Sequence, residues 1–226
     1  MRVIGFDIDG TLLLSGGAGA RALDRAFEEL LGVPDAFGGI HPHGMTDDGI
    51  VQEMGARSIG RRLTSEEIAA VRERYAFHMP AELRRSEEFR IMPGVPELLE
   101  RLSKDGDFLL GLVTGNYEKT GRMKLAHAGL EHHFRFGGWG TDSADRFELT
   151  RVGLDRGRAL AGDGLSKDSV FLVGDTVHDV RCGLAAGAVV IAVATGPATT
   201  DILRAEGAHH ALEDLTDTEG FLGIVG

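Results

Sequence analysis

Four short apolar runs, each followed by small or acidic residues, constrain the fold of this chain more than any other feature. Runs of this kind are typical of strands buried on both faces of a parallel sheet. Helical patterns at Val95 to Leu102, Glu118 to Ala128 and His178 to Ala186 separate the later runs. The alternation predicts a doubly wound α/β sheet. The predicted strands are Val3 to Phe6, Phe108 to Val113, Val170 to Val173 and Val189 to Val193.

The region from residue 16 to residue 90 has helical patterns and no convincing strand. We expect helices at Ala20 to Leu31, Asp47 to Ile59 and Ser65 to Leu83. This region is far longer than a single crossover needs. It therefore predicts a helical cap domain at 16–90, inserted in a core domain of 1–15 and 91–226. The alternative is that these helices simply cover one face of the sheet. The glycines of "LSGGAG" favour a hinge at the start of the cap.

Composition narrows the classes of function. The net charge of −11 argues against a nucleic-acid partner, because such binding depends on Lys and Arg neutralising phosphates. The single cysteine, Cys182, excludes an internal disulfide and favours a reducing compartment, so the cytoplasm is expected. No apolar stretch predicts a signal peptide or a membrane span. We expect a monomer or a homodimer.

Polar residues follow three of the predicted strands, at the edge where open α/β sheets bind ligands. They include four carboxylates, which repel one another unless a cation or a shared proton is present. Mg²⁺ is the cation that best suits carboxylate and carbonyl oxygens beside a phosphate. The residues are Asp7 and Asp9 after the first run, Thr114, Gly115 and Asn116 after the second, and Asp175 and Asp179 after the third.

Phosphoryl chemistry gives each residue type a role. Asp7 is predicted as a nucleophile that forms an aspartyl-phosphate, and Asp9 as the general acid and base. Gly10 allows a sharp turn that frees backbone N–H groups. The Thr114 hydroxyl and the backbone N–H groups of Gly115 and Asn116 are predicted to hold phosphate oxygens.

The segments "DIDGT", "LVTGN" and "VFLVGDTVHD" resemble, in order and spacing, the first, second and fourth motifs of the haloacid dehalogenase superfamily. This resemblance implies a Rossmann-like three-layer core with a small α-helical cap inserted after the first strand. It also implies that Asp7, Asp175 and the backbone carbonyl of Asp9 hold Mg²⁺, supported by Asp179. The family's third motif normally supplies a lysine, but no clean match is present. Arg146 stands in the corresponding place, shortly before a helix, and is predicted to supply the positive charge.

Other candidate residues have weaker claims. Arg151 is the alternative to Arg146, although an exposed helical position suits it better. Lys119 and Lys124 are expected to face solvent. A cap loop of a family member faces the active site, so His43, Thr46 and Asp47 are predicted to contact the substrate. Other histidines (His41, His132, His133, His209 and His210) and Cys182 are expected to have no catalytic role.

These residues predict an Mg²⁺-dependent phosphatase acting on a small phosphate monoester, with phosphoglycolate-like metabolites as a reasonable class. A phosphomutase of the β-phosphoglucomutase type would keep both Asp7 and Asp9 and stays open as an alternative. A non-catalytic phosphate-binding protein is the other alternative, although it would not need a nucleophile and an acid together.

Overall fold

The computed structural model describes residues 1–162 and 164–226, and its core is a six-stranded sheet whose paired strands run parallel. The strand order is β5-β4-β1-β6-β7-β8, which confirms the predicted α/β fold class. The strands of this sheet are β1 (Arg2–Phe6), β4 (Phe108–Thr114), β5 (Phe136–Trp139), β6 (Val170–Gly174), β7 (Val189–Val193) and β8 (His210–Leu212).

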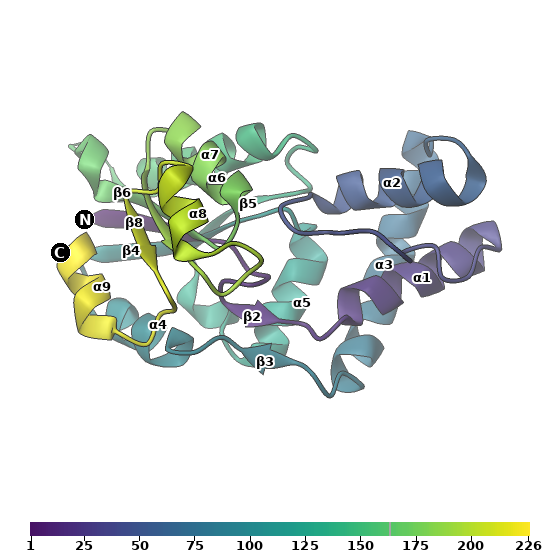
Figure 1. Ribbon diagram of the computed structural model, residues 1–226, viewed down its shortest axis with the longest axis horizontal. Helices are drawn as coiled ribbons and strands as arrows, with labels where there is room; N and C mark the ends of the chain where they lie inside the picture. The colour runs from purple at the N-terminus through teal and green to yellow at the C-terminus, as the bar shows by residue number, and fades with distance from the viewer. Residues whose placement is uncertain (163) are drawn as a thin grey trace.

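Helices cover both faces of the sheet and make a three-layer core (Figure 1). Ile4 and Phe6 of β1 belong to a buried cluster with α4, α5 and α9, whereas Val3 packs on the other face with α6. This alternation is the two-residue period of a strand buried on both faces. The helices are α4 (Val95–Lys104), α5 (Glu118–Ala128), α6 (Arg146–Ala161), α7 (Val177–Ala185), α8 (Thr200–Ala205) and α9 (Thr218–Val225), with short 3₁₀ turns η1 (Glu131–His133) and η2 (Lys167–Ser169).

Two core strands, β5 and β8, are absent from the sequence-based prediction. The β5 sequence, Phe-Gly-Gly-Trp, has only four residues, of which two are glycines that disfavour strands, so its strand signal is weak. The glycines are needed because α6 lies very close to this strand. A Cβ on Gly153 of α6 would lie 2.8 Å from the Gly138 backbone. Strand β8 has only three residues, too few for a periodic pattern.

The region between β1 and α4 contains the three predicted helices, α1 (Ala18–Leu31), α2 (Asp47–Ile59) and α3 (Ser65–Arg84). They lie together at the end of the molecule opposite the two chain termini (Figure 1). Their apolar residues form a second cluster, which includes Phe27, Met54 and Met79 and also Tyr117 from the loop after β4. Two short antiparallel strands, β2 (Leu13–Leu14) and β3 (Arg90–Ile91), pair where the chain leaves and rejoins the core. The division into two domains stays a prediction.

Helix ends in this region follow local sequence signals. Thr64 and Glu67 form a reciprocal capping box at the start of α3, and the Thr46 hydroxyl accepts the Gly49 N–H at the start of α2. Helix α1 ends at Gly32, which has a left-handed backbone (φ 69°). Among the described residues, no helix is both long and apolar enough to cross a membrane.

Candidate active site

The polar residues predicted from the strand ends meet at one edge of the sheet. Strand β1 lies between β4 and β6, and all three run in the same direction. Asp7 directly follows β1, Thr114 is the last residue of β4, and Asp175 directly follows β6. The order of strands along the chain reverses at β1, and ligands of open α/β sheets bind at such points. The parallel sheet therefore explains why residues far apart in sequence share one site.

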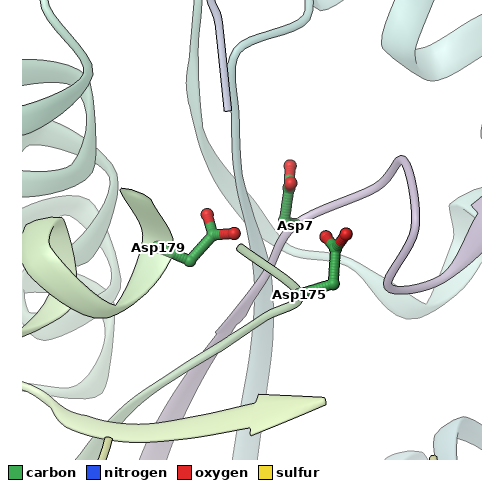
Figure 2. A group of neighbouring side chains, drawn as sticks. All are labelled: Asp7, Asp175 and Asp179. Carbon is green, nitrogen blue, oxygen red and sulfur yellow. The ribbon is translucent and has the colours of Figure 1, made fainter. Parts of the chain in front are cut away.

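Three buried carboxylates form the centre of this site. Figure 2 shows Asp7, Asp175 and Asp179 around a common space, and one oxygen of each lies within 4.8 Å of the others. Burial raises the pKa of Asp7 to about 6, although Arg146 opposes this rise. Burial, followed by the charges of Asp179 and Asp7, raises the pKa of Asp175 to about 8. The cluster therefore favours a bound cation or a retained proton.

The surroundings of Asp175 fit a hard metal ion. Its Oδ1 accepts a hydrogen bond from the Thr11 hydroxyl at 3.1 Å, whereas its buried Oδ2 has no hydrogen-bond partner among the described residues. A buried oxygen without a partner is costly. Gly10 has a left-handed backbone (φ 91°), and a Cβ there would lie 2.7 Å from Asp175 Cγ. The turn at Gly10 thus packs directly on the carboxylate, and the unpaired oxygen suits a cation such as Mg²⁺.

Arg146 is the cation beside the predicted nucleophile. It is the first residue of α6, and its Nη2 donates to Asp7 Oδ2 at 3.1 Å and to Asp179 Oδ1 at 2.6 Å. Burial alone would lower its pKa, but Asp179 and Asp7 raise it above its usual value. Arg151, one turn or so further along α6, is exposed and pairs with acidic neighbours on its own helix. Of the two arginines considered, only Arg146 lies at the site.

Asp179 is held from two sides. Its Oδ2 accepts the Thr176 backbone N–H at 3.0 Å and the Thr176 hydroxyl at 2.7 Å, in a capping box at the start of α7. Its Oδ1 accepts from Arg146. Both oxygens therefore already have donors, which suits a residue that orients the cluster.

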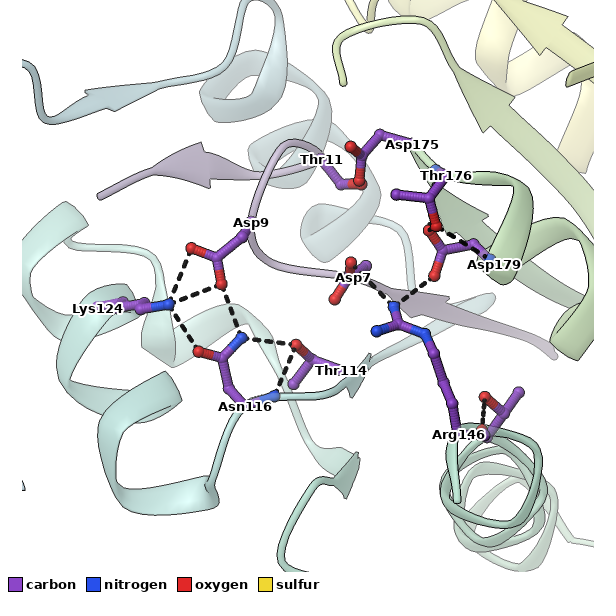
Figure 3. A network of polar contacts seen from close by, with 11 residues as sticks. Asp7, Asp9, Thr11, Thr114, Asn116, Lys124, Arg146, Asp175, Thr176 and Asp179 are labelled. Atoms are coloured by element: carbon purple, nitrogen blue, oxygen red, sulfur yellow. Dashed lines mark hydrogen bonds and ion pairs between the residues drawn. The ribbon is translucent and has the colours of Figure 1, made fainter. Parts of the chain in front are cut away.

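The loop after β4 forms the next wall of the site. Figure 3 shows Asn116 between Thr114 and Asp9, with its Nδ2 donating to Thr114 Oγ1 at 2.8 Å and to Asp9 Oδ2 at 2.8 Å. Thr114 is fully buried, and its hydroxyl also accepts the Asn116 backbone N–H at 3.4 Å. Gly115 packs against the loop before α2, where a Cβ would lie 2.9 Å from Thr46 Cα. Asn116 therefore connects the end of β4 directly to Asp9.

The prediction that Lys124 faces solvent is wrong. Its residue exposure is only 4%, and its Nζ contacts Asp9 Oδ1 at 2.8 Å, Asp9 Oδ2 at 2.7 Å and Asn116 Oδ1 at 2.6 Å. Its burial reflects its position on the helix rather than an apolar pattern in the sequence. Lys124 follows the buried residues Thr120 and Gly121 by one helical turn, so it lies on the inner face of α5. Lys119 is exposed, as expected.

The loop before α2 packs on the loop after β4. The Asp47 backbone N–H donates to Gly115 O at 2.8 Å, and the Asp47 side chain accepts the Tyr117 backbone N–H at 2.7 Å. The Thr46 hydroxyl donates to Ala144 O in the core at 3.1 Å. Burial raises the pKa of Asp47 to about 6, although the charge of Lys124 opposes this rise. Two of the three predicted cap residues, His43 and Asp47, line the cavity described next.

A cavity of about 440 Å³ lies between the region of α1, α2 and α3 and the strand ends. Its floor includes Asp7, Asp9, Thr114, Lys124 and Arg146. Its walls toward α1, α2 and α3 contain many apolar or small residues, which include Leu14, Leu23, Phe37, Met45 and Ile50. The polar and charged members of these walls are Ser15, His43, Asp47, Tyr75, Glu88 and Arg90. This volume suits a small metabolite rather than a polymer.

The residues expected to have no catalytic role lie elsewhere. Cys182 is buried in α7, and burial raises the pKa of its thiol to about 11, so a reactive thiolate is disfavoured. His41, His132, His209 and His210 are exposed, and His133 pairs with Ser103 at 2.7 Å.

Comparison with known families agrees with this arrangement. Residues 4–193 match the family described as haloacid dehalogenase-like hydrolases. The match covers most of the chain, so the chain belongs to this family. The resemblance stated from the three sequence segments is therefore confirmed, as is the prediction of an enzyme of the hydrolase class.

Individual relatives and solved structures add detail. The chain is 27% identical over 202 residues to a phosphoglycolate phosphatase of Haemophilus influenzae strain Rd, covering 86% of each protein. A structure of a "predicted phosphoglycolate phosphatase" from Haemophilus somnus 129pt aligns with a TM-score of 0.71 at 20% identity, covering 98% of each chain. The structure of CbbY from Rhodobacter sphaeroides in complex with phosphate aligns with a TM-score of 0.70 at 17% identity, covering 96% of each chain. At these identities the solved structures support the fold.

Proposed function

We propose that this protein is an Mg²⁺-dependent phosphatase that hydrolyses a small phosphate monoester through an aspartyl-phosphate on Asp7. The observation that carries the proposal is the position of Asp7. It directly follows β1, accepts a hydrogen bond from Arg146, and belongs to a carboxylate cluster in which a buried Asp175 oxygen has no partner among the described residues. A nucleophile, a fixed positive charge and a cation-binding cluster at one strand end are what phosphoryl transfer requires.

In the first step, a carboxylate oxygen of Asp7 attacks phosphorus while the bond from phosphorus to the ester oxygen breaks. The Asp9 carboxyl gives its proton to the departing oxygen, so the alcohol leaves as a neutral molecule. Arg146, hydrogen-bonded to Asp7 and Asp179, places its charge beside the phosphoryl group. The Thr114 hydroxyl and the backbone N–H groups after it are the donors for the remaining phosphate oxygens.

In the second step, water attacks the phosphorus of the aspartyl-phosphate and the bond from phosphorus to Asp7 breaks. Asp9, now a carboxylate, takes a proton from this water, and inorganic phosphate leaves. Asp7, Asp175 and the Asp9 backbone carbonyl would hold Mg²⁺, with Asp179 in support. The ion would offset negative charge on the phosphoryl group and on the clustered carboxylates.

The cavity and a named relative support a small phosphorylated metabolite as the substrate class. The cavity of about 440 Å³ leaves room for a small leaving group beyond the phosphate. The Haemophilus influenzae relative is named a phosphoglycolate phosphatase. A phosphoglycolate-like metabolite is therefore the class to test first.

Turnover of p-nitrophenyl phosphate with and without Mg²⁺ tests this proposal. We expect hydrolysis that depends on Mg²⁺ and that falls by roughly a thousandfold or more in Asp7→Asn. Mass spectrometry of acid-quenched enzyme should find one phosphoryl group on Asp7. Asp201→Asn, which removes an exposed carboxylate on α8, is the matched control and should behave as wild type.

Other outcomes identify other functions. Binding of phosphate without turnover would indicate the non-catalytic binding protein. Conversion of a sugar phosphate into its positional isomer, with little free phosphate, would indicate a phosphomutase. Retained turnover in Asp7→Asn would rule out Asp7 as the nucleophile.

A further inference from the structure

Lys124 is a buried cation for which the catalytic steps above have no role. It lies on the inner face of α5, and its ammonium group is removed from water. Burying an ammonium group is costly unless charged or polar partners surround it. All three contacts of Nζ go to two residues of the active site, Asp9 and Asn116, at 2.6 to 2.8 Å. A lysine has three N–H donors, so its hydrogen-bonding capacity is used in full.

The same contacts fix the carboxylate of Asp9. Its side chain is 37% exposed and lines the cavity, so little packing restrains it. Lys124 contacts both of its oxygens, and Asn116 donates a further hydrogen bond to Oδ2. Asn116 is itself held by Thr114 at the end of β4 (Figure 3). The orientation of Asp9 is therefore set by α5 and the end of β4.

This arrangement separates two cationic roles in the site. Arg146 contacts Asp7 and Asp179, whereas Lys124 contacts Asp9 and lies on the other side of the cavity floor (Figure 3). Among the described residues, Lys124 makes the only ion pair recorded for Asp9. A proton must pass to or from Asp9 in each step, and such transfers require hydrogen-bond geometry with the reacting oxygen. A group that fixes the carboxylate therefore affects the rate without touching the substrate.

We propose that Lys124 is a positioning residue, which, together with Asn116, holds the carboxyl group of Asp9 in place for proton transfer to the leaving group. This inference rests on the proposed phosphatase function. It assigns to Lys124 a task distinct from that of Arg146, which acts at the phosphoryl group. It predicts that removal of Lys124 reproduces part of the defect caused by removal of the Asp9 acid.

Two esters distinguish this role from a general structural one. p-Nitrophenyl phosphate has a good leaving group and needs little protonation, whereas glycerol 1-phosphate has a poor leaving group and depends on the acid. We expect Lys124→Met to lower kcat for glycerol 1-phosphate about tenfold more than kcat for p-nitrophenyl phosphate. KM should change little, because Lys124 has no free donor for the substrate. Lys119→Met, an exposed lysine on the same helix, should match wild type for both esters.

A double variant tests whether Lys124 acts through Asp9. If it does, Asp9→Asn with Lys124→Met should be about as slow as Asp9→Asn alone, because the effects of coupled residues are not additive. Lys124→Arg keeps the charge in a different geometry and should show a smaller leaving-group effect. If thermal unfolding shows that Lys124→Met does not fold, Lys124→Arg still tests the proposal.

Three results would overturn the inference: equal slowing of both esters by Lys124→Met, multiplicative losses in the double variant, or a change confined to KM. The last would indicate that Lys124 binds the substrate. If wild-type protein with Mg²⁺ hydrolyses neither ester, the proposed function itself fails. If wild type is active and Asp9→Asn is selective for the leaving group but Lys124→Met is not, only the role of Lys124 fails.

Discussion

In this site, buried charged side chains contact a side chain of opposite charge or a hydrogen-bond donor. Arg146 pairs with Asp7 and Asp179, and Lys124 pairs with Asp9. The exception is the unpartnered oxygen of Asp175. Removal of one member of a buried pair leaves its partner unpaired, so the effects of substitution depend on what remains.

Arg146 and Arg151 allow a comparison within one helix. Arg146→Ala removes the charge beside Asp7, and we expect kcat/KM for p-nitrophenyl phosphate to fall by about a hundredfold or more. Arg151 makes only exposed ion pairs, so Arg151→Ala should leave kcat/KM close to wild type and change stability by no more than about 0.5 kcal/mol. Steady-state kinetics and thermal unfolding measure both effects. The opposite ranking would transfer the cationic role to Arg151.

The raised pKa of Asp47 predicts that the free energy of unfolding depends on pH. Its pKa is raised from 3.8 to about 6 by burial, so the folded protein binds its proton more tightly than the unfolded chain does. The associated stability is fully present below about pH 3.8 and is lost as pH rises through about 6. Asp47→Asn cannot ionise, and its amide oxygen still accepts the Tyr117 N–H. We therefore expect this variant to be more stable than wild type at pH 7 to 8, by roughly 2 to 3 kcal/mol.

Denaturant unfolding at pH 5 and pH 8 measures this difference. Asp201→Asn removes a carboxylate from an exposed side chain. We expect this control to change the free energy of unfolding only slightly, and by the same amount at both pH values. If Asp47→Asn is less stable than wild type at pH 8, the carboxylate stabilises the docked cap loop more than its burial costs.

At the scale of elements, the sequence predicts the helices and strands that have a local residue pattern. It misses those whose residues are set by the close approach of two backbones. Short apolar runs and glycine-terminated helical patterns predict four core strands and most helices, with ends within about two residues of the structure. Strand β5 was missed because its glycines serve the packing of α6 rather than strand propensity. Lys124 was misjudged because α5 has a polar-looking sequence, and only the neighbouring strand ends show why its inner face carries a charge.

Two glycine-to-alanine substitutions test the close approach of α6 and β5. A Cβ on Gly153 would lie 2.8 Å from the Gly138 backbone, which cannot move aside as a side chain does. We expect Gly153→Ala to destabilise the protein by roughly 1 to 3 kcal/mol and to lower activity, because α6 carries Arg146 at its start. Gly223 lies inside α9 with no atom within 4 Å of such a Cβ.

The same change at Gly223 should therefore have the opposite sign. Alanine is favoured over glycine inside a helix by about 0.5 to 1 kcal/mol, so Gly223→Ala should stabilise the protein slightly. Thermal unfolding of both variants measures the contrast. Equal effects would mean that helix propensity, rather than contact between α6 and β5, governs the outcome at Gly153.

At the scale of the whole molecule, the carboxylate cluster contains residues from the ends of two neighbouring strands, β1 and β6, and from helix α7. Asp7 follows β1, Asp175 follows β6, and Asp179 lies in the first turn of α7. Their convergence requires β1 to pair with β6 and α7 to form, so an ion bound by them stabilises the folded state over the unfolded chain. A ligand that binds only the folded state adds about 2.7 kcal/mol at a hundredfold excess over its Kd.

We therefore expect Mg²⁺ to raise the Tm, and EDTA to reverse the rise. The effect should grow with pH, because Mg²⁺ must displace protons from carboxyls whose pKa values are raised, to about 6 for Asp7 and about 8 for Asp175. Stabilisation should thus be small at pH 5.5 and larger at pH 8, as differential scanning calorimetry would measure. Asp175→Asn should abolish most of the rise, whereas Asp201→Asn should retain it. A rise of equal size at both pH values, or one that survives Asp175→Asn, would place the ion elsewhere on this acidic protein.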